Sequence, residues 1–208
     1  MAYFPNRLMA EAGAYAEAYF DELTSAYGTV DRDAVTAAGA LLAETVRAGR
    51  TIYTCGNGGS AAIANHLVCD CLKGVRAGST LAPRVHSLSS NVELLTALAN
   101  DFGVETMFSF PLESVGQAGD VLISISSSGT SPNIVRAIET ARSLGMKTIA
   151  MSGFAGGASR ELADVSLHVE TENYGIVEDV HQSLMHLLAQ HLRHTHLENP
   201  STLGSIKF

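Results

Sequence analysis

One short stretch of the chain carries five hydroxyl side chains: Ser126, Ser127, Ser128, Thr130 and Ser131. It follows the apolar run Val121-Leu-Ile-Ser-Ile and precedes Pro132, which suits the first position of a helix. A helix N-cap accounts for one of these hydroxyls but not for five. Hydroxyls and backbone N–H groups at a helix N-terminus can together saturate the oxygens of a phosphate. The stretch therefore predicts a phosphate-binding loop in preference to a merely serine-rich one.

A second loop of small residues, Cys55-Gly-Asn-Gly-Gly-Ser60, also lies between an apolar run and a predicted helix. Its glycines let the backbone approach a ligand, and the helix dipole attracts negative charge. An NAD site is disfavoured because the next predicted strand, 84–88, ends without an acidic residue. A structural glycine turn is the alternative for this loop alone. Together the two loops predict a phosphorylated ligand held from two sides.

Imidazole and carboxylate groups lie at helical spacing after the second loop and near the end of the chain. His66 and Asp70 are four residues apart and share a helix face, while Glu178 and His186 lie roughly on one side of the last predicted helix. Such groups could perform general acid–base chemistry or bind a divalent metal such as zinc, or they could be solvated pairs. Eight residues of helix rise about 12 Å. Glu178 and His186 could therefore share an ion only if the helix begins late or a second subunit contributes.

The composition excludes several classes of protein. The 208 residues fit one domain, and 46% of them are apolar, which is enough for a sizeable core. The net charge of -8, without any basic run, argues against direct nucleic-acid binding. The sequence has no apolar run of membrane-spanning length and no signal-peptide pattern, so we expect no membrane association and a cytoplasmic location. Three cysteines are too few for a disulfide framework.

The elements that must position these residues alternate between helix and strand. Two amphipathic helices are predicted first, over 6–26 and 31–48. Five strands then alternate with helices: strands 51–55, 84–88, 121–126, 148–152 and 165–169, and helices 60–73, 91–99, 132–144, 157–163 and 177–194. This order predicts a three-layer α/β/α sandwich with a five-stranded parallel sheet, followed by an irregular tail. Both small-residue loops would lie at the carboxyl edge of the sheet, where ligands bind in such folds.

Four motifs in this order resemble sugar isomerase (SIS) domains, and among them the branch that acts on heptose phosphates. These are Cys55–Ser60, the following helix with His66, Ala99-Asn-Asp101-Phe-Gly, and the segment from Gly119 to Ser131. The resemblance covers nearly the whole chain. It implies a flavodoxin-like SIS fold over 1–208 as a single domain, with N-terminal helices in 1–50, the core and last helix in 51–197 and a tail in 198–208.

The resemblance also implies an activity and an assembly. The activity is aldose–ketose isomerisation of a sugar phosphate, sedoheptulose 7-phosphate to D-glycero-D-manno-heptose 7-phosphate, through an enediol-type proton transfer. The assembly is a homotetramer with active sites between subunits and one zinc ion per site.

Site residues follow from the same resemblance, position by position. The substrate-binding residues would be Asn57, Gly58, Ser60, Asp101, Ser126, Ser127, Ser128, Ser131 and Glu178. The metal ligands would be His66, Asp70, Glu178 and His186. Asp70 is the expected base or metal ligand, and His186 is its expected acid–base partner. These four are the only carboxylate and imidazole groups expected near both loops.

The chain departs from the family pattern at five positions. Asp70 replaces the usual Glu, Glu178 the usual Gln and Ile63 a usual Asp, while Gly74, beside Lys73, and Gly175 replace a basic and an acidic residue. Two alternatives to heptose phosphate isomerisation therefore stay open. One is an isomerase of another ketose phosphate. The other is a non-catalytic binder of phosphosugars or proteins, like the SIS protein that regulates replication initiation.

Overall fold

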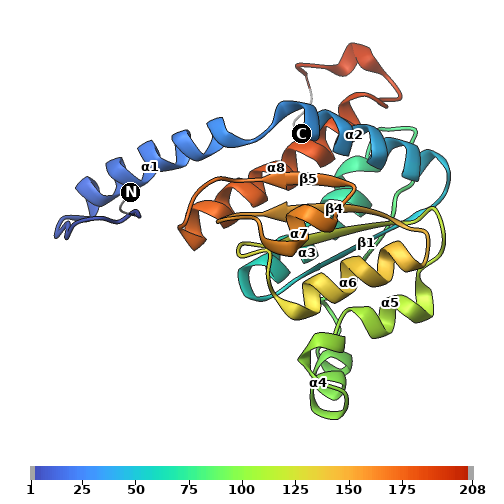
Figure 1. The fold of residues 1–208 in the computed structure, drawn as a ribbon. Coiled ribbons are helices and arrows are strands. Elements are labelled where there is room, and N and C mark those ends of the chain that lie inside the picture. Colours follow the sequence, from blue (N-terminus) through green and yellow to red (C-terminus); the bar gives the residue numbers. More distant parts are fainter. Residues whose placement is uncertain (1–2, 206–208) are drawn as a thin grey trace.

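The computed structural model describes residues 3–205, so the last three residues of the expected tail and the first two of the chain lie outside it. Five parallel strands form one sheet in the order β2-β1-β3-β4-β5. The strands are β1 (Thr51–Gly56), β2 (Arg84–Ser87), β3 (Val121–Ser126), β4 (Lys147–Ser152) and β5 (Val165–His168). Helices cover both faces (Figure 1), so the predicted three-layer α/β/α fold is confirmed.

Eight α-helices and three shorter helices complete the described part of the chain. The α-helices are α1 (Ala12–Thr29), α2 (Arg32–Arg47), α3 (Gly58–Cys69), α4 (Val92–Asp101), α5 (Ser109–Val115), α6 (Pro132–Ser143), α7 (Gly157–Leu162) and α8 (Tyr174–His194). The shorter ones are the π-helix η1 (Asp70–Val75) and the 3-10 helices η2 (Val104–Thr106) and η3 (Pro200–Thr202).

The elements predicted from the sequence need five corrections. The first helix begins at Ala12 and not near residue 6, and the last begins at Tyr174 and not at Val177. The predicted helix 60–73 is an α-helix that changes to a π-helix at Asp70. Helix α5 was missed because it is short and carries Pro111 in its first turn. The tail contains the 3-10 turn η3, although we predicted it to be irregular.

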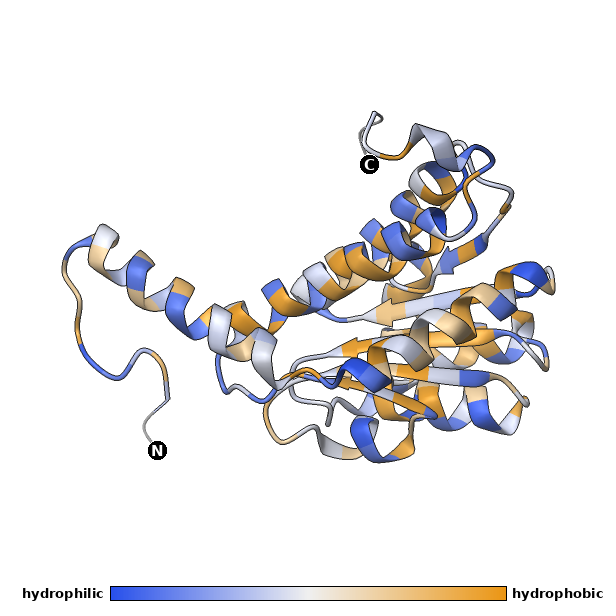
Figure 2. Ribbon diagram, turned by 90° about the horizontal axis from the view of Figure 1, so that it is seen from above, coloured by the Kyte–Doolittle hydropathy of each residue, from blue (hydrophilic) through white to orange (hydrophobic). Residues whose placement is uncertain are grey.

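Alternating strand residues build two separate cores. Ile52, Val121 and Ile123 face a core that contains residues of α2, α3 and α8, while Tyr53 and Leu122 face a core with residues of α5 and α6. This alternation follows from the two-residue repeat of a β-strand. Strands β1 and β3 are buried along their whole length. Figure 2 shows the sheet strands as predominantly hydrophobic between helices of mixed character.

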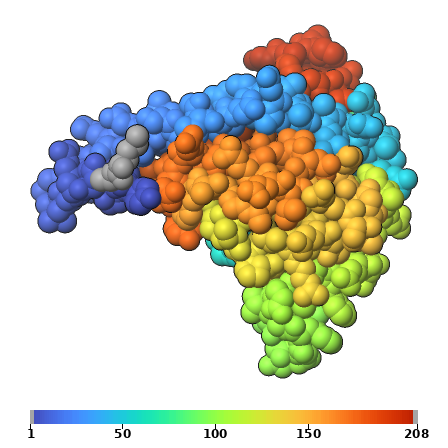
Figure 3. All heavy atoms as spheres, in the orientation of Figure 1, coloured from blue at the N-terminus to red at the C-terminus, as the bar shows by residue number. Residues whose placement is uncertain are grey.

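Two helices extend beyond this body. The N-terminal part of α1 projects away from the sandwich (Figure 1), and α1 is tied to α8 by hydrogen bonds from Tyr19 to Asp179 and between Tyr27 and Ser183. Helix α4 protrudes at the opposite end of the molecule (Figure 3). Its neighbourhood exposes large apolar side chains, including Val92 and the stacked pair Phe102 and Phe110. Within residues 3–205, no helix is long and apolar enough to cross a membrane.

Candidate active site

The serine-rich loop lies where the sequence predicts it, between the carboxyl end of β3 and the N-terminus of α6. Ser131 occupies the N-cap position of α6, but its hydroxyl makes no capping hydrogen bond. The Ser127 hydroxyl is buried and has no hydrogen-bond partner among the described residues. Because a buried hydroxyl without a partner is costly, Ser127 is a group for which a ligand would provide a hydrogen bond. The Ser131 hydroxyl, which is partly exposed and makes no capping bond, is also available to a ligand.

A neighbouring loop holds the serine loop in place through close backbone contacts. The Gly153 amide donates to the Ser127 carbonyl over 2.9 Å, and the Ser159 amide donates to the Gly129 carbonyl over 2.9 Å. A side chain at Gly129 would overlap the carbonyl group of Gly156, and Gly129 also has a left-handed φ of 65°. Only glycine meets both requirements at this position. The hydroxyls are therefore presented on a fixed backbone.

The two small-residue loops face one cavity of about 110 Å³, as the sequence predicts. Its lining residues are Asn57, Ser60, Ile125, Ser126, Ser127, Ser128, Ser131, Tyr174 and Glu178. The Asn57 side chain is fixed by two amide hydrogen bonds with Asn133, of 3.0 and 2.8 Å. None of these lining residues is a lysine or arginine. An anion bound here would depend on hydroxyls, backbone N–H groups and two helix N-termini.

Among the lining residues of this cavity, Glu178 is the one with a carboxylate. It lies against Gly59 at the N-terminus of α3, so closely that a side chain at position 59 would overlap its carboxylate. Burial, followed by the charge of Asp179, raises the pKa of Glu178 above its ordinary value. The protonated form that the higher pKa favours would coexist more easily with a phosphate in the same cavity.

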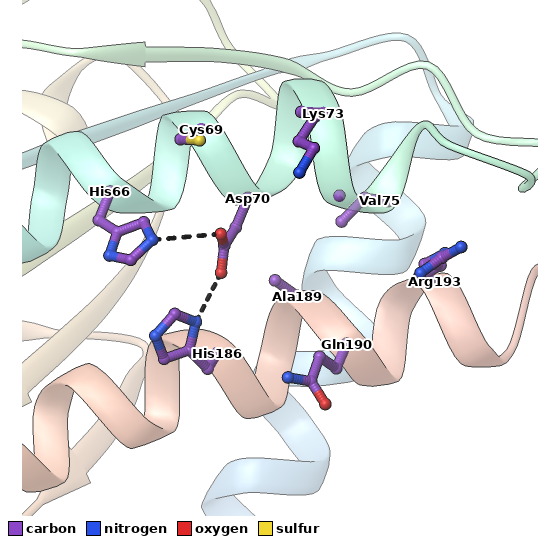
Figure 4. Close-up of a pocket in the computed structure, with 10 residues that line it drawn as sticks. His66, Cys69, Asp70, Lys73, Val75, His186, Ala189, Gln190 and Arg193 are labelled. Carbon is purple, nitrogen blue, oxygen red and sulfur yellow. Dashed lines mark hydrogen bonds and ion pairs between the residues drawn. The ribbon is translucent and has the colours of Figure 1, made fainter. Parts of the chain in front are cut away.

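An imidazole–carboxylate group lies further along the same two helices. Asp70 Oδ2 is hydrogen-bonded to His186 Nδ1 over 2.7 Å, and its Oδ1 lies 3.4 Å from His66 Nε2, at ion-pair distance (Figure 4). The two imidazole rings are perpendicular, with centroids 4.8 Å apart. One possible ligand atom from each of these three residues lies within 4.8 Å of the others, which is compact enough to hold a metal ion.

This group opens into a groove of about 330 Å³ between α3–η1 and α8 (Figure 4). Lys73 from η1 and Arg193 from α8 line its far end. The π-turn matters here because it begins at Asp70 and changes the direction of the side chains that follow. Lys73 therefore brings a cation to the groove, although position 74 is Gly74 in this chain.

Two residues, Glu178 and Asp101, do not lie where the resemblance implied. Glu178 does not belong to the group of His66, Asp70 and His186, since it lies in the serine-loop cavity. Asp101 ends α4 and lines neither of the two cavities; its carboxylate accepts a hydrogen bond from Asn100. The helix rise between Glu178 and His186 argued against their binding one ion together, and their positions in two different cavities agree with that argument. The remaining substrate residues line the serine-loop cavity, except Gly58, which begins α3 and is not among the lining residues.

Sequence reasoning missed two residues of the site. Gln182 lies between His66 and His186 and is hydrogen-bonded to both, and Tyr174 lines the serine-loop cavity. Positions 174, 178, 182 and 186 are spaced four residues apart along α8, which indicates one helix face but does not by itself single out Gln182. His181, on the same helix, is fully buried in the core and lines neither cavity.

The chain that carries this serine-rich loop and imidazole–carboxylate group matches a known family. The chain matches the SIS domain family over residues 15–153 and therefore belongs to it. A phosphoheptose isomerase of Akkermansia muciniphila is 37% identical over 171 residues, which cover 82% of this chain and 87% of the relative. One of Nitratidesulfovibrio vulgaris is 36% identical over 178 residues, which cover 86% of this chain and 85% of the relative.

A solved structure agrees with these relatives. The structure of a phosphoheptose isomerase from Neisseria gonorrhoeae superposes on this chain with a TM-score of 0.80 at 29% identity. The match covers 88% of this chain and 98% of that one. Within the SIS domain family, the chain thus belongs with the phosphoheptose isomerases.

Proposed function

We propose that this chain is an aldose–ketose isomerase that converts sedoheptulose 7-phosphate to D-glycero-D-manno-heptose 7-phosphate. The observation that carries the proposal is the contact between Asp70 and His186 on the helices that also border the serine-loop cavity. Ser60 and His66 are six residues apart on α3, which corresponds to about 9 Å of helix rise. A sugar phosphate could thus place its phosphate at the serine loop and its carbonyl end near the histidines.

The chemistry requires a base at carbon and a proton carrier at oxygen. Asp70 is our candidate for the base that removes the proton from the carbon next to the carbonyl group. In the metal-free site, His186 would move a proton between the two sugar oxygens, because its ring contacts Asp70 and lines the same groove. The serine loop, with Asn57, Ser60 and Glu178, would hold the phosphate and the nearby sugar hydroxyls.

The family resemblance also implies zinc, and the donor set fits it. His66, Asp70 and His186 offer two imidazole nitrogens and a carboxylate oxygen, which are ordinary zinc ligands. We propose that these three residues hold one zinc ion per site, without Glu178. When bound, the metal would supply Lewis-acid stabilisation of a sugar oxygen.

We further propose a homotetramer in the cytoplasm. The family resemblance implies that Asp101 lines a substrate site, whereas in this chain it lines neither cavity. Asp101 could reach the site of another copy if α4 packs against that copy. This position supports the assembly. The exposed Phe102 and Phe110 provide apolar surface for such packing. The free thiols of Cys55, Cys69 and Cys71 suit a reducing compartment.

A turnover assay with a panel of ketose phosphates, with and without added zinc, tests this function. We expect conversion of sedoheptulose 7-phosphate to the aldose and little conversion of shorter ketose phosphates. Turnover of a different ketose phosphate alone would correct the substrate. Tight binding of the sugar phosphate without turnover would instead favour the non-catalytic binder.

A further inference from the structure

The Gln182 side chain hydrogen-bonds to both histidines of the site from their outer side. Its Nε2 lies 3.1 Å from His66 Nδ1 and 2.8 Å from His186 Nε2. The other ring nitrogens, His66 Nε2 and His186 Nδ1, are those that face Asp70. Gln182 and Asp70 therefore contact opposite edges of the same two rings.

These bonds determine where the imidazole protons lie. A neutral imidazole has one N–H donor and one acceptor nitrogen. When the Gln182 amide nitrogen donates to both outer nitrogens, the proton of each ring must be on the inner nitrogen, pointing at Asp70. In that state both inner N–H groups face Asp70, His186 donates to it, and neither inner nitrogen has a lone pair to offer a metal.

The same side chain can support the opposite state. A half-turn of the amide exchanges its nitrogen with its oxygen, and an amide oxygen can accept two hydrogen bonds. Both outer nitrogens would then carry protons, and both inner nitrogens would present lone pairs next to the carboxylate of Asp70. Histidines that bind metals commonly donate their second N–H to such an acceptor.

We propose that Gln182 is a positioning residue that sets the tautomers of His66 and His186 together. Its amide nitrogen faces the rings in the metal-free protein, and its amide oxygen faces them when a divalent cation is bound. This inference rests on the proposed metal site of His66, Asp70 and His186. Gln182 would thereby couple the tautomeric states of two metal ligands that lie on different helices, His66 on α3 and His186 on α8.

Two substitutions separate this role from simple space filling between the helices. Gln182→Met keeps a side chain of similar length but removes every hydrogen bond to the rings. Gln182→Glu replaces the amide by a carboxylate, which has two acceptor oxygens and no donor. Gln190→Met is the matched control, because Gln190 lines the same groove two turns further along α8 and has no hydrogen bond to either histidine. Melting temperatures of all variants establish that each one folds.

The first measurement is the tautomeric state of both rings in the metal-free protein, from long-range proton–nitrogen NMR correlations. We expect the proton on Nε2 of His66 and on Nδ1 of His186 in the wild type and in Gln190→Met. We expect mixed tautomers in Gln182→Met and protons on the outer nitrogens in Gln182→Glu. Wild-type tautomers in Gln182→Met would overturn the proposal for the metal-free state.

The second measurement is the affinity for Zn²⁺ alone, by competition with a chelating dye. Removing such an outer partner typically weakens metal binding by about 10–100-fold, which we expect for Gln182→Met. Gln182→Glu should bind at least as tightly as the wild type. Wild-type affinity in Gln182→Met would overturn the acceptor role. A wild-type protein that binds no Zn²⁺ would overturn the metal site itself, while the tautomers still decide the role of Gln182 in the metal-free protein.

Discussion

Asp70 Oδ2 lies 2.7 Å from His186 Nδ1, although 116 positions separate the two residues in the chain. The contact exists because α3 and α8 pack against each other over one face of the sheet. Ile63 and Leu67 from α3 share a core with Leu184 and Leu188 from α8. Ile63, which replaces a usual acidic residue, is buried in that core. Apolar packing thus brings the two polar groups together.

Ser131→Ala should weaken the binding of sugar phosphate more than it weakens folding. The Ser131 hydroxyl makes no capping bond, so its removal costs the helix little, whereas a hydrogen bond to a charged group contributes about 1.5–3 kcal/mol. The dissociation constant should rise by about 10–100-fold in calorimetric titration. Ser143→Ala, at the other end of α6, is the control. Unchanged affinity in Ser131→Ala and in Ser128→Ala would refute the phosphate-binding role of the loop.

Gly129→Ala should destabilise the protein much more than Gly49→Ala. Both glycines have a left-handed φ, of 65° and 68°, so both variants incur a backbone cost of about 1 kcal/mol. Only at Gly129 would the new methyl group also overlap a neighbouring carbonyl, which should add about 1–3 kcal/mol. Urea unfolding measures both. Equal losses would show that the loop beyond β4 does not constrain the serine loop.

Acidification should destabilise the fold through His181. Complete burial lowers the pKa of His181 from 6.5 to about 4, so the folded protein holds this ring neutral. Below pH 6.5 the unfolded chain takes up the proton first, and stability is lost as the pH falls from 6.5 towards 4. The free energy of unfolding should fall by about 2 kcal/mol between about pH 7 and pH 5 from this group alone.

His181→Leu should reduce this pH dependence, whereas His194→Asn, at an exposed site on the same helix, should not. Urea unfolding at several pH values would measure the difference. An identical pH dependence in wild type and His181→Leu would contradict the assignment.

Four copies of the 21.9 kDa chain should sediment together if α4 packs on a neighbour. Phe102→Ser should then shift the protein to smaller species, because it removes an exposed ring that is stacked only on Phe110. Leu203→Ser, at another exposed apolar residue, should leave the assembly intact. A monomeric wild-type protein with full activity would refute the assembly and the role proposed for Asp101.

The sequence predicts the sheet and both loops because these features follow from local patterns. Apolar runs that end in small residues indicate β1 and β3, and hydroxyls before Pro132 indicate the phosphate-binding loop. The π-turn at Asp70 could not be predicted, because α and π helices have the same local composition. Gln182 also escaped prediction, because its role depends on the packing of α8 against α3. Four-residue spacing alone cannot distinguish Gln182, in the site, from Gln190, which has no bond to the histidines.

Glu178 illustrates a different limit. The family resemblance implied that Glu178 binds a metal together with His186. The helix rise of about 1.5 Å per residue argues against a shared ion, because the two residues are eight positions apart. The structure places the carboxylate beside Gly59, where glycine alone leaves it room. The spacing of residues along a helix can be read from the sequence, but which turn of the helix faces which cavity cannot.

The exchange of substrate protons with solvent tests the central claim most directly. Isomerisation through Asp70 and His186 should incorporate solvent deuterium at the carbon next to the carbonyl group of sedoheptulose 7-phosphate, as NMR can follow. We predict exchange and aldose formation with the wild type, and neither with His186→Gln, which should still fold and still bind the sugar phosphate. Exchange by His186→Gln at the wild-type rate, or its absence from a wild-type protein that binds the sugar phosphate, would contradict the account.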